Sequence, residues 1–391
     1  MKNNMKLTPE GTKDFLFAEC SAMDYICGKI ENVFVSGGFK RVITPGIEFY
    51  DVFSIPCSGI SQESMFKTTD NRGRILVARP DSTLPIARMV STRLKNSTLP
   101  VRLYYKQAVY RNNPTLTGRR NELMQMGVEL LGVKGKRADI DILTTAVKSI
   151  SEVADDFRIE LGHAEVFNAL SQELDIDEYF KERIRATIES KNYSALNNLL
   201  DKLEPCKAVS AIRSLPSLFG GEDVFDKAAQ ICKGTNAESA LEYLHDIYSD
   251  LAPLNLGDKL IIDLGLVQRN DYYTGIVFTG YIEGIGDAVI SGGRYDELLS
   301  EFGTPMGAAG FAIDTDAITI KHLSDDNVSY SDNPDVLVFA EDGHEIEAIN
   351  YVDELNKSGV KARFSVLPSI EETKDFAFKR GIPEVKIING C

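Results

Sequence analysis

The chain has 391 residues, a net charge of −15 and an apolar fraction of 43%. This length suggests two or three domains, and the apolar fraction is sufficient for sizeable hydrophobic cores. A strongly acidic chain has no general electrostatic attraction to nucleic acid or to an anionic membrane, so neither is an expected partner. No apolar run reaches membrane-spanning length, and the start of the chain lacks the apolar segment of a signal peptide. We therefore expect a cytoplasmic protein.

The cysteines and histidines give no sign of a metal site or a disulfide framework. None of the cysteines is spaced as in a CxxC motif, which argues against a zinc ribbon and a secreted disulfide scaffold. Only four histidines occur, and none is paired with another at ligand spacing. We expect reduced thiols, no metal and no cofactor. The six cysteines are Cys20, Cys27, Cys57, Cys206, Cys232 and Cys391.

The first hundred residues predict a helix, a strand, a hairpin and a second helix. Apolar residues spaced by three and four predict a helix over 18–35, which Gly37 and Gly38 end. Residues 39–49 are typical of a strand that ends at Pro45 and leads to a new element. Residues 66–78 predict a hairpin with its turn at 71–73. Residues 79–83 then break the strand and begin a helix that runs to about Lys95. Asp81 is either a ligand-binding residue or only the helix cap.

Two further strands are predicted over 101–111 and 121–131. The second has an apolar face, and its other face carries Gln125 and Glu129 with Gly127 between them. On one strand these two polar residues lie about 13 Å apart. They can form a floor that grips a small polar molecule at both ends. The pattern equally allows a solvent-exposed strand face.

The middle of the chain predicts a helix over 138–154, a strand over 157–161 and then helices over about 165–251. This helical segment carries no chemical motif and is interpreted as an insertion. Strands are expected again over 259–266 and 272–282. Successive side chains on a strand point to opposite faces. We therefore expect one phenol of Tyr272 and Tyr273 to line a site and the other to support it, although a plain core strand is the commoner role of such a pair.

The last third predicts a glycine turn at 291–296, a small-residue strand over 306–313 and a helix that closes the first domain at about residue 322. After a linker over 323–333, residues 334–391 alternate as βαβαβ, which predicts a small α/β domain with a parallel sheet. This segment has seven Lys or Arg against eleven Asp or Glu, a net charge of −4. The fold class is therefore α+β, with an antiparallel sheet flanked by helices over 1–322.

Several motifs together resemble histidyl-tRNA synthetases and their paralogues, which belong to the class II synthetases. The resemblance covers about residues 8–320 in the right order. It implies a class II synthetase-like antiparallel sheet and a dimer interface at the segment called motif 1. The matching segments are Pro9–Asp14, the motif 1 strand Phe39–Pro45, Arg79–Thr83, the motif 2 residues Tyr110-Arg111, Gly118-Arg119 and Gln125–Glu129, the signature Asp271-Tyr272-Tyr273-Thr274-Gly275, and Ser291–Asp296.

The sequence departs from the family where an active synthetase binds ATP. Asn113 replaces the acidic residue that reads adenine, and Ala317 replaces the arginine of motif 3 that contacts the phosphates. Asp314 and Asp316 stand nearby and repel a triphosphate. Gln268 occupies the place of a signature arginine. The short, acidic C-terminal segment also suits tRNA binding poorly. We therefore expect no catalytic residues.

The elements that the resemblance assigns to histidine recognition are kept. Asp81, Thr83 and Gln125 are expected at the α-ammonium. Glu129 is expected to accept a hydrogen bond from an imidazole N–H, while Tyr273 bonds the other ring nitrogen and Tyr272 supports it. Motif 2 also keeps Arg111. The full set of expected histidine-binding residues is Asp81, Thr83, Arg111, Gln125, Glu129, Gln268, Tyr272 and Tyr273.

The sequence retains the residues assigned to amino-acid recognition but lacks those that bind ATP. In this combination it resembles the regulatory subunits of short-form ATP phosphoribosyltransferases. That resemblance implies L-histidine as effector and the short-form catalytic subunit as partner. It also implies a hetero-oligomer, self-association through the motif 1 region, and feedback inhibition of the first step of histidine biosynthesis. Two alternatives stay open: a divergent, active histidyl-tRNA synthetase, supported by Arg111 and Arg119, and a class II-like enzyme such as an amino-acid:protein ligase.

Overall fold

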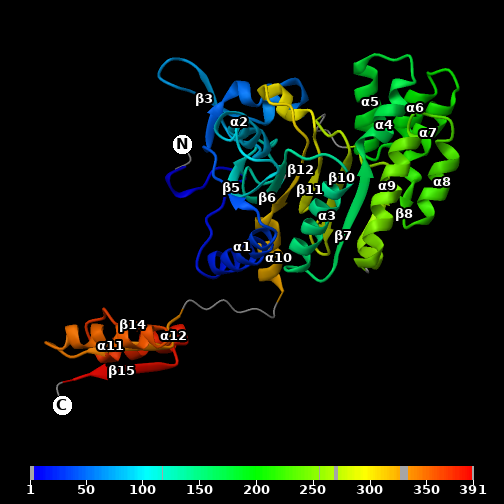
Figure 1. Ribbon diagram of the computed structural model, residues 1–391. Coiled ribbons are helices and arrows are strands. Elements are labelled where there is room, and N and C mark those ends of the chain that lie inside the picture. Colours follow the sequence, from blue (N-terminus) through cyan, green and yellow to red (C-terminus); the bar gives the residue numbers. More distant parts are fainter. Residues whose placement is uncertain (1–3, 117, 255, 268–271, 326–332, 390–391) are drawn as a thin grey trace. The chain divides into compact units, whose positions relative to one another are not determined.

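A computed structural model describes residues 4–116, 118–254, 256–267, 272–325 and 333–389. The chain divides into two compact units. The larger contains residues 1–15 and 22–325, and the smaller contains residues 16–21 and 326–391. In the described part of the chain, no helix is both long and apolar enough to cross a membrane. Figure 1 shows the helices and strands of both units.

The larger unit is built on a nine-stranded sheet with the order β1-β5-β6-β12-β11-β10-β7-β9-β8. Neighbouring strands are antiparallel except for two parallel pairs, β1 with β5 and β7 with β9. The strands are β1 Lys40–Arg41, β5 Val101–Tyr110, β6 Glu122–Leu131, β7 Phe157–His163, β8 Phe219–Gly220, β9 Leu260–Asp263, β10 Ile276–Ile282, β11 Ile290–Arg294 and β12 Ala308–Asp314.

One face of this sheet is covered by α1 (Ala18–Ser36), α3 (Lys136–Ser151) and α10 (Thr315–Ser324). The buried residues of α1 recur every three or four positions, as expected for one face of a helix. They pack on Met126 and Val128, which are on the apolar face that the sequence predicts for β6. The opposite face carries a separate cluster, in which Leu84 and Ile86 of α2 (Thr83–Arg93) join Tyr105 and Val277 of the sheet. This second face contains the candidate site.

A small antiparallel sheet lies beside α2, with the order β2-β4-β3. Its strands are β2 Ile47–Phe49, β3 Phe66–Thr69 and β4 Ile75–Ala78. β3 and β4 form the predicted hairpin, in which Asp70 accepts hydrogen bonds from the backbone N–H groups of Arg72 and Arg74. The strand predicted to end at Pro45 is shorter than expected, since β1 is only Lys40–Arg41, and the new element expected after Pro45 is β2. The chain forms β1, continues without regular structure through Pro45 and enters the second sheet as β2.

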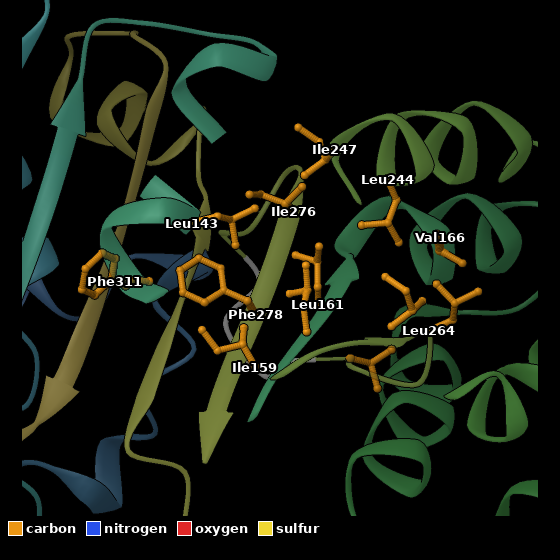
Figure 2. Packing of buried hydrophobic residues seen from close by; sticks show 14 of the residues in the cluster. Leu143, Ile159, Leu161, Val166, Leu244, Ile247, Leu264, Ile276, Phe278 and Phe311 are labelled. Carbon is orange, nitrogen blue, oxygen red and sulfur yellow. The ribbon is translucent and has the colours of Figure 1, made fainter. Parts of the chain in front are cut away.

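Six helices follow β7 and gather at the β7–β9–β8 end of the large sheet (Figure 1). Figure 2 shows Leu244 and Ile247 of the last of these helices pointing toward Leu161 of β7 and Ile276 of β10. These apolar contacts join the helical region to the sheet in one core. The helices are α4 Ala164–Gln172, α5 Glu178–Glu189, α6 Tyr193–Leu200, α7 Lys207–Ser214, α8 Asp223–Ile231 and α9 Glu238–Leu251.

The smaller unit has the predicted βαβαβ order with a fully parallel sheet, β14-β13-β15. Val336 and Val338 pack with the first helix, and Leu337 packs with the second. Alternate residues of the central strand thus face different helices, so each face of the sheet is covered by one helix. The elements are β13 Val336–Ala340, α11 Glu345–Lys357, β14 Ala362–Phe364, α12 Ile370–Arg380 and β15 Glu384–Ile388.

Two predictions near the site are wrong. The glycine turn expected at 291–296 is mostly strand β11, because Gly292 and Gly293 relieve crowding inside the sheet rather than reverse the chain. A Cβ at Gly292 would overlap the Gly310 carbonyl, and one at Gly293 would lie 2.8 Å from the ring of Tyr273. The strand expected from residue 272 begins only at Ile276, so Tyr272 and Tyr273 precede it.

Candidate functional site

Two rows of neighbouring residues cross the sheet on the face that carries α2. The first row pairs Glu129 of β6 with Gly310 of β12, and Gly310 with Gly293 of β11. The second pairs Gln125 with Asp314. Directly paired residues project from the same face of a sheet. A Cβ at Gly310 would overlap Oε2 of Glu129, so this glycine leaves room on the face for the Glu129 carboxylate.

Glu129 is the most buried acid of this face, with 1% of its surface exposed. Its Oε1 accepts a hydrogen bond from the Thr83 hydroxyl at 2.8 Å, and its Oε2 accepts one from the Tyr295 hydroxyl. Burial raises the pKa of Glu129 to about 8, although these two hydroxyls lower it. Each carboxylate oxygen has two lone pairs. Glu129 can therefore accept a further hydrogen bond from a ligand.

Three tyrosines form an aromatic wall beside this carboxylate. Tyr272 and Tyr273 have ring centroids 4.7 Å apart, and Tyr272 meets Tyr295 edge-on at 5.6 Å. Burial holds the pKa of all three hydroxyls above the usual range, so each keeps its proton and can donate. Both members of the Tyr272–Tyr273 pair line the same cavity. The expectation that only one phenol faces the site is wrong, because the alternation rule does not apply before β10 begins.

The cavity between these elements has a volume of about 160 Å³. Gln125 forms part of its lining and is 6% exposed, which removes the alternative of a solvent-exposed strand face. Asp81 also lines the cavity while its Oδ1 accepts from the Leu84 N–H at 3.0 Å, so it caps α2 and contributes to the site at once. Arg111 stands at the rim, where its Nε donates to the Pro80 carbonyl at 3.2 Å.

The acids of the motif 3 segment are held by the protein itself. Oδ1 of Asp314 accepts from the backbone N–H groups of Asp316 and Ala317 and caps α10. Asp316 is 2% exposed, pairs with Arg120 at 2.7 Å and accepts from the Met124 N–H. Burial raises the pKa of Asp316 to about 6, and Arg120 opposes this. In the segment that would contact a nucleotide, the aspartates are therefore bonded to the α10 backbone and to Arg120.

A larger cavity of about 520 Å³ also borders Tyr273. Its charged side chains pair with one another, Arg185 with Glu182 and Lys181 with Glu178. In the described ranges, no group of three or more His, Cys, Asp and Glu residues could hold a metal ion. The convergence of buried polar groups on one small space distinguishes the cavity at Glu129 as the candidate site.

Comparisons with known proteins agree with this architecture. The family model described as histidyl-tRNA synthetase matches residues 11–318. A relative from Clostridium kluyveri, named an ATP phosphoribosyltransferase regulatory subunit, is 39% identical over 99% of this chain and 100% of its own length. The chain belongs to the family of ATP phosphoribosyltransferase regulatory subunits. Relatives of the same name from Clostridium acetobutylicum (38% identical, 98% of this chain and 96% of the relative) extend the match.

Solved structures place this regulatory-subunit chain in the class II synthetase-like fold that the sequence predicts. A crystal structure from Bacillus halodurans, titled as an ATP phosphoribosyltransferase regulatory subunit/histidyl-tRNA synthetase, has a TM-score of 0.87 at 27% identity and covers 99% of both chains. A histidyl-tRNA synthetase from a Nostoc species has a TM-score of 0.77 at 22% identity, over 96% of this chain and 89% of that one. The latter shows the shared fold alone.

The structure of this family member brings seven of the eight expected residues to one cavity, either in its lining or, for Glu129, through Thr83 and Tyr295. The eighth, Gln268, lies outside the described residues. Sequence reasoning missed Tyr295 and Gly310. Tyr295 lies close after Gly292 and Gly293, a pair that the sequence assigns to a turn in preference to a ligand cradle. Gly310 acquires its role through its pairing with Glu129. A cross-strand alignment of β6, β12 and β11 is the signal that could have found both.

Proposed function

We propose that this chain is a non-catalytic, cytoplasmic subunit that binds L-histidine and assembles with the short-form catalytic subunit of ATP phosphoribosyltransferase. In this proposal it is required for the first step of histidine biosynthesis and for its feedback inhibition. The observation that carries the proposal is the buried Glu129 carboxylate, which has room because Gly310 lacks a side chain and which is held by the hydroxyls of Thr83 and Tyr295, two residues that line a small cavity. The names of the relatives support the regulatory role.

The site suits an imidazole because both ring nitrogens need partners once they are buried. Glu129 accepts from one ring N–H, and the Tyr273 hydroxyl bonds the other nitrogen, with Tyr272 packed behind it. A hydrogen bond to a carboxylate is stronger than one between neutral groups. Discrimination against an apolar side chain follows, since such a ligand would leave the buried carboxylate without the added donor.

The remaining groups suit the two charged ends of an amino acid. Asp81 and Gln125 are available to the α-ammonium, and Thr83 lies between them and Glu129. Arg111 at the rim is the counter-ion for the α-carboxylate and also lowers the pKa values of Asp81 and Asp314. Burial raises both of those values, which favours occupants that bring positive charge to the two acids. Gln268 remains an expected contact of the same ligand.

The absence of synthetase chemistry is supported by the motif 3 segment. Ala317 offers no cation to a triphosphate, and Arg120 is engaged by Asp316. Acidic groups at this position raise the cost of placing phosphates there. The retained Arg111 favours a second candidate, a divergent active histidyl-tRNA synthetase. That candidate requires histidine-dependent exchange of pyrophosphate into ATP.

Self-association is proposed for the region of motif 1 and the small β2-β4-β3 sheet. Five large apolar side chains there are between 38% and 68% exposed in the single chain, and burying them against a second copy would remove this surface from water. They are Ile43, Ile47, Phe49, Phe66 and Ile75.

The proposal is tested by reconstitution with a short-form catalytic subunit from the same source. The wild-type chain should form a complex, support phosphoribosyl transfer and confer inhibition by L-histidine. Glu129→Gln keeps the shape of the side chain and replaces one acceptor oxygen by an amide NH2, which cannot accept a hydrogen bond, so the complex should form and histidine should no longer inhibit. Glu122→Gln, at the start of the same strand, is the matched control and should behave as wild type. A wild-type chain that forms no complex, or inhibition that survives Glu129→Gln, would refute the proposal.

A further inference from the structure

Arg294 lies between the two parts of the chain that shape the candidate pocket. It ends β11 and is 5% exposed. Its predecessor, Gly293, forms the floor under the Tyr273 ring, and its successor, Tyr295, donates to Glu129. The stem of Arg294 packs on Gly275, where a Cβ would lie 2.9 Å from Arg294 Cδ. One side chain thus fixes the backbone on both sides of the aromatic wall.

The backbone around Arg294 is tied to the segment that follows the tyrosine pair. The Thr274 N–H donates to the Arg294 carbonyl at 2.8 Å, and the Asp296 N–H donates to the Thr274 hydroxyl at 3.0 Å. Asp296 in turn accepts from Nη1 of Arg294 at 2.8 Å and from the Ala308 N–H at 3.0 Å. Displacement of the guanidinium would therefore shift Thr274 and Tyr295 together.

The guanidinium also reaches the helical region through one buried acid. Nε of Arg294 donates to Oδ1 of Asp139 at 2.9 Å, and Nη2 lies 2.6 Å from the same oxygen. Asp139 is on α3 and is fully buried. Its other oxygen, Oδ2, accepts from the Tyr243 hydroxyl of α9 at 2.5 Å. Burial raises the pKa of Asp139, and Arg294 and Tyr243 lower it, so the ionised carboxylate depends on both partners.

We propose that Arg294 is a positioning residue which, through Asp139 and Tyr243, couples the ligand pocket to the helical region formed by α4–α9. Ligand contact with Glu129 and Tyr273 fixes Tyr295 and Thr274, and the network transfers that constraint to α9. By reciprocity, any change that loosens α9 at Tyr243 weakens ligand binding. This inference rests on the proposed binding of L-histidine, and it assigns the helical region as the part of the chain that senses occupancy.

The test compares two identical substitutions on the same helix. Tyr243→Phe removes only the hydroxyl that contacts Asp139. Tyr248→Phe is the matched control, because Tyr248 is also on α9 but packs against Phe225, with ring centroids 5.5 Å apart. Calorimetry with L-histidine should show binding that is weaker by roughly two- to thirtyfold for Tyr243→Phe and unchanged for Tyr248→Phe.

Two further readouts separate coupling from a general loss of structure. In the wild type, L-histidine should slow amide hydrogen exchange in α9, and this slowing should be lost in Tyr243→Phe. A double-mutant cycle of Tyr243→Phe with Tyr295→Phe should be non-additive for histidine affinity, since Asp139 and Arg294 connect the Tyr243 hydroxyl to the backbone that positions Tyr295. Arg294→Lys, if it folds, should match the Tyr243→Phe effect or exceed it.

The outcomes distinguish this inference from the proposal on which it rests. A wild-type chain that does not bind L-histidine would refute the proposed function. Binding by the wild type with equal affinities for Tyr243→Phe and Tyr248→Phe, or with additive effects in the cycle, would overturn the coupling alone.

Discussion

The two ends of strand β6 carry polar groups of the same kinds but use them differently. At the Glu129 end, the hydroxyls of Thr83 and Tyr295 hold one carboxylate, and Gly310 leaves room for it. At the Gln125 end, Asp316 is paired with Arg120, and Asp314 caps α10. The Glu129 carboxylate adjoins two residues of the cavity lining, whereas Asp314 and Asp316 are held by the backbone of α10 and by Arg120. From this difference we propose that the amino-acid site is retained while contacts within the chain occupy the neighbouring nucleotide site.

Removal of the Glu129 carboxylate should have the largest effect on this comparison. Glu129→Ala deletes the acceptor for the ligand and leaves the Tyr295 hydroxyl buried without its partner. We expect L-histidine binding, measured by calorimetry, to weaken at least about thirtyfold. Unchanged affinity for L-histidine in a folded variant would show that Glu129 does not contact the ligand.

The pH dependence of stability should reveal the buried acid before any ligand binds. The pKa of Glu129 is raised from 4.5 to about 8 in the folded chain. Between these values the folded state holds a proton that the unfolded state has lost, so rising pH destabilises the wild type. Relative to Glu129→Gln, its free energy of unfolding should fall by about 1.4 kcal/mol per pH unit between pH 5 and 7. Urea unfolding of both proteins checks this, and parallel pH profiles would contradict it.

The space that the Glu129 carboxylate occupies beside Gly310 can be narrowed without replacing any polar residue. The methyl group of Gly310→Ala would overlap Oε2 of Glu129 and displace the carboxylate. We expect histidine affinity to fall about tenfold, with a loss of about 1–3 kcal/mol in the free energy of unfolding. Gly286→Ala is the control, because a Cβ there has nothing within 4 Å. Equal affinities for the two variants would mean that the glycine row does not shape the site.

The smallest effect on histidine binding is expected for a substitution of Asp316. Asp316→Asn weakens the ion pair to Arg120 but changes no residue of the cavity lining. The free energy of unfolding should fall by about 1–3 kcal/mol, since a buried charged partner is left behind, while histidine affinity changes less than about threefold. A large loss of histidine affinity would show that the Asp316–Arg120 pair contributes to the site at Glu129. Chemical unfolding and calorimetry on one preparation provide both values.

The sequence predicted those parts of the site that follow from local periodicity. Alternation along β6 placed Gln125 and Glu129 on one face, and the βαβαβ pattern of the smaller unit followed from its alternating apolar runs. The same rule failed for Tyr272 and Tyr273, because they precede β10 in an irregular segment. Gly292 and Gly293 were assigned to a turn because paired glycines usually form one. Their real role depends on Tyr273 and Gly310, which are distant in sequence and adjacent only through strand register.

The central claim is that the amino-acid site persists without the chemistry of a synthetase. Exchange of labelled pyrophosphate into ATP by the purified chain, measured with saturating L-histidine alongside histidine calorimetry, tests it most directly. The account predicts that L-histidine binds with a stoichiometry of about one per chain and that exchange stays at the level of a protein-free control. Histidine-dependent exchange above that level would contradict it and would identify the chain as an active, divergent synthetase.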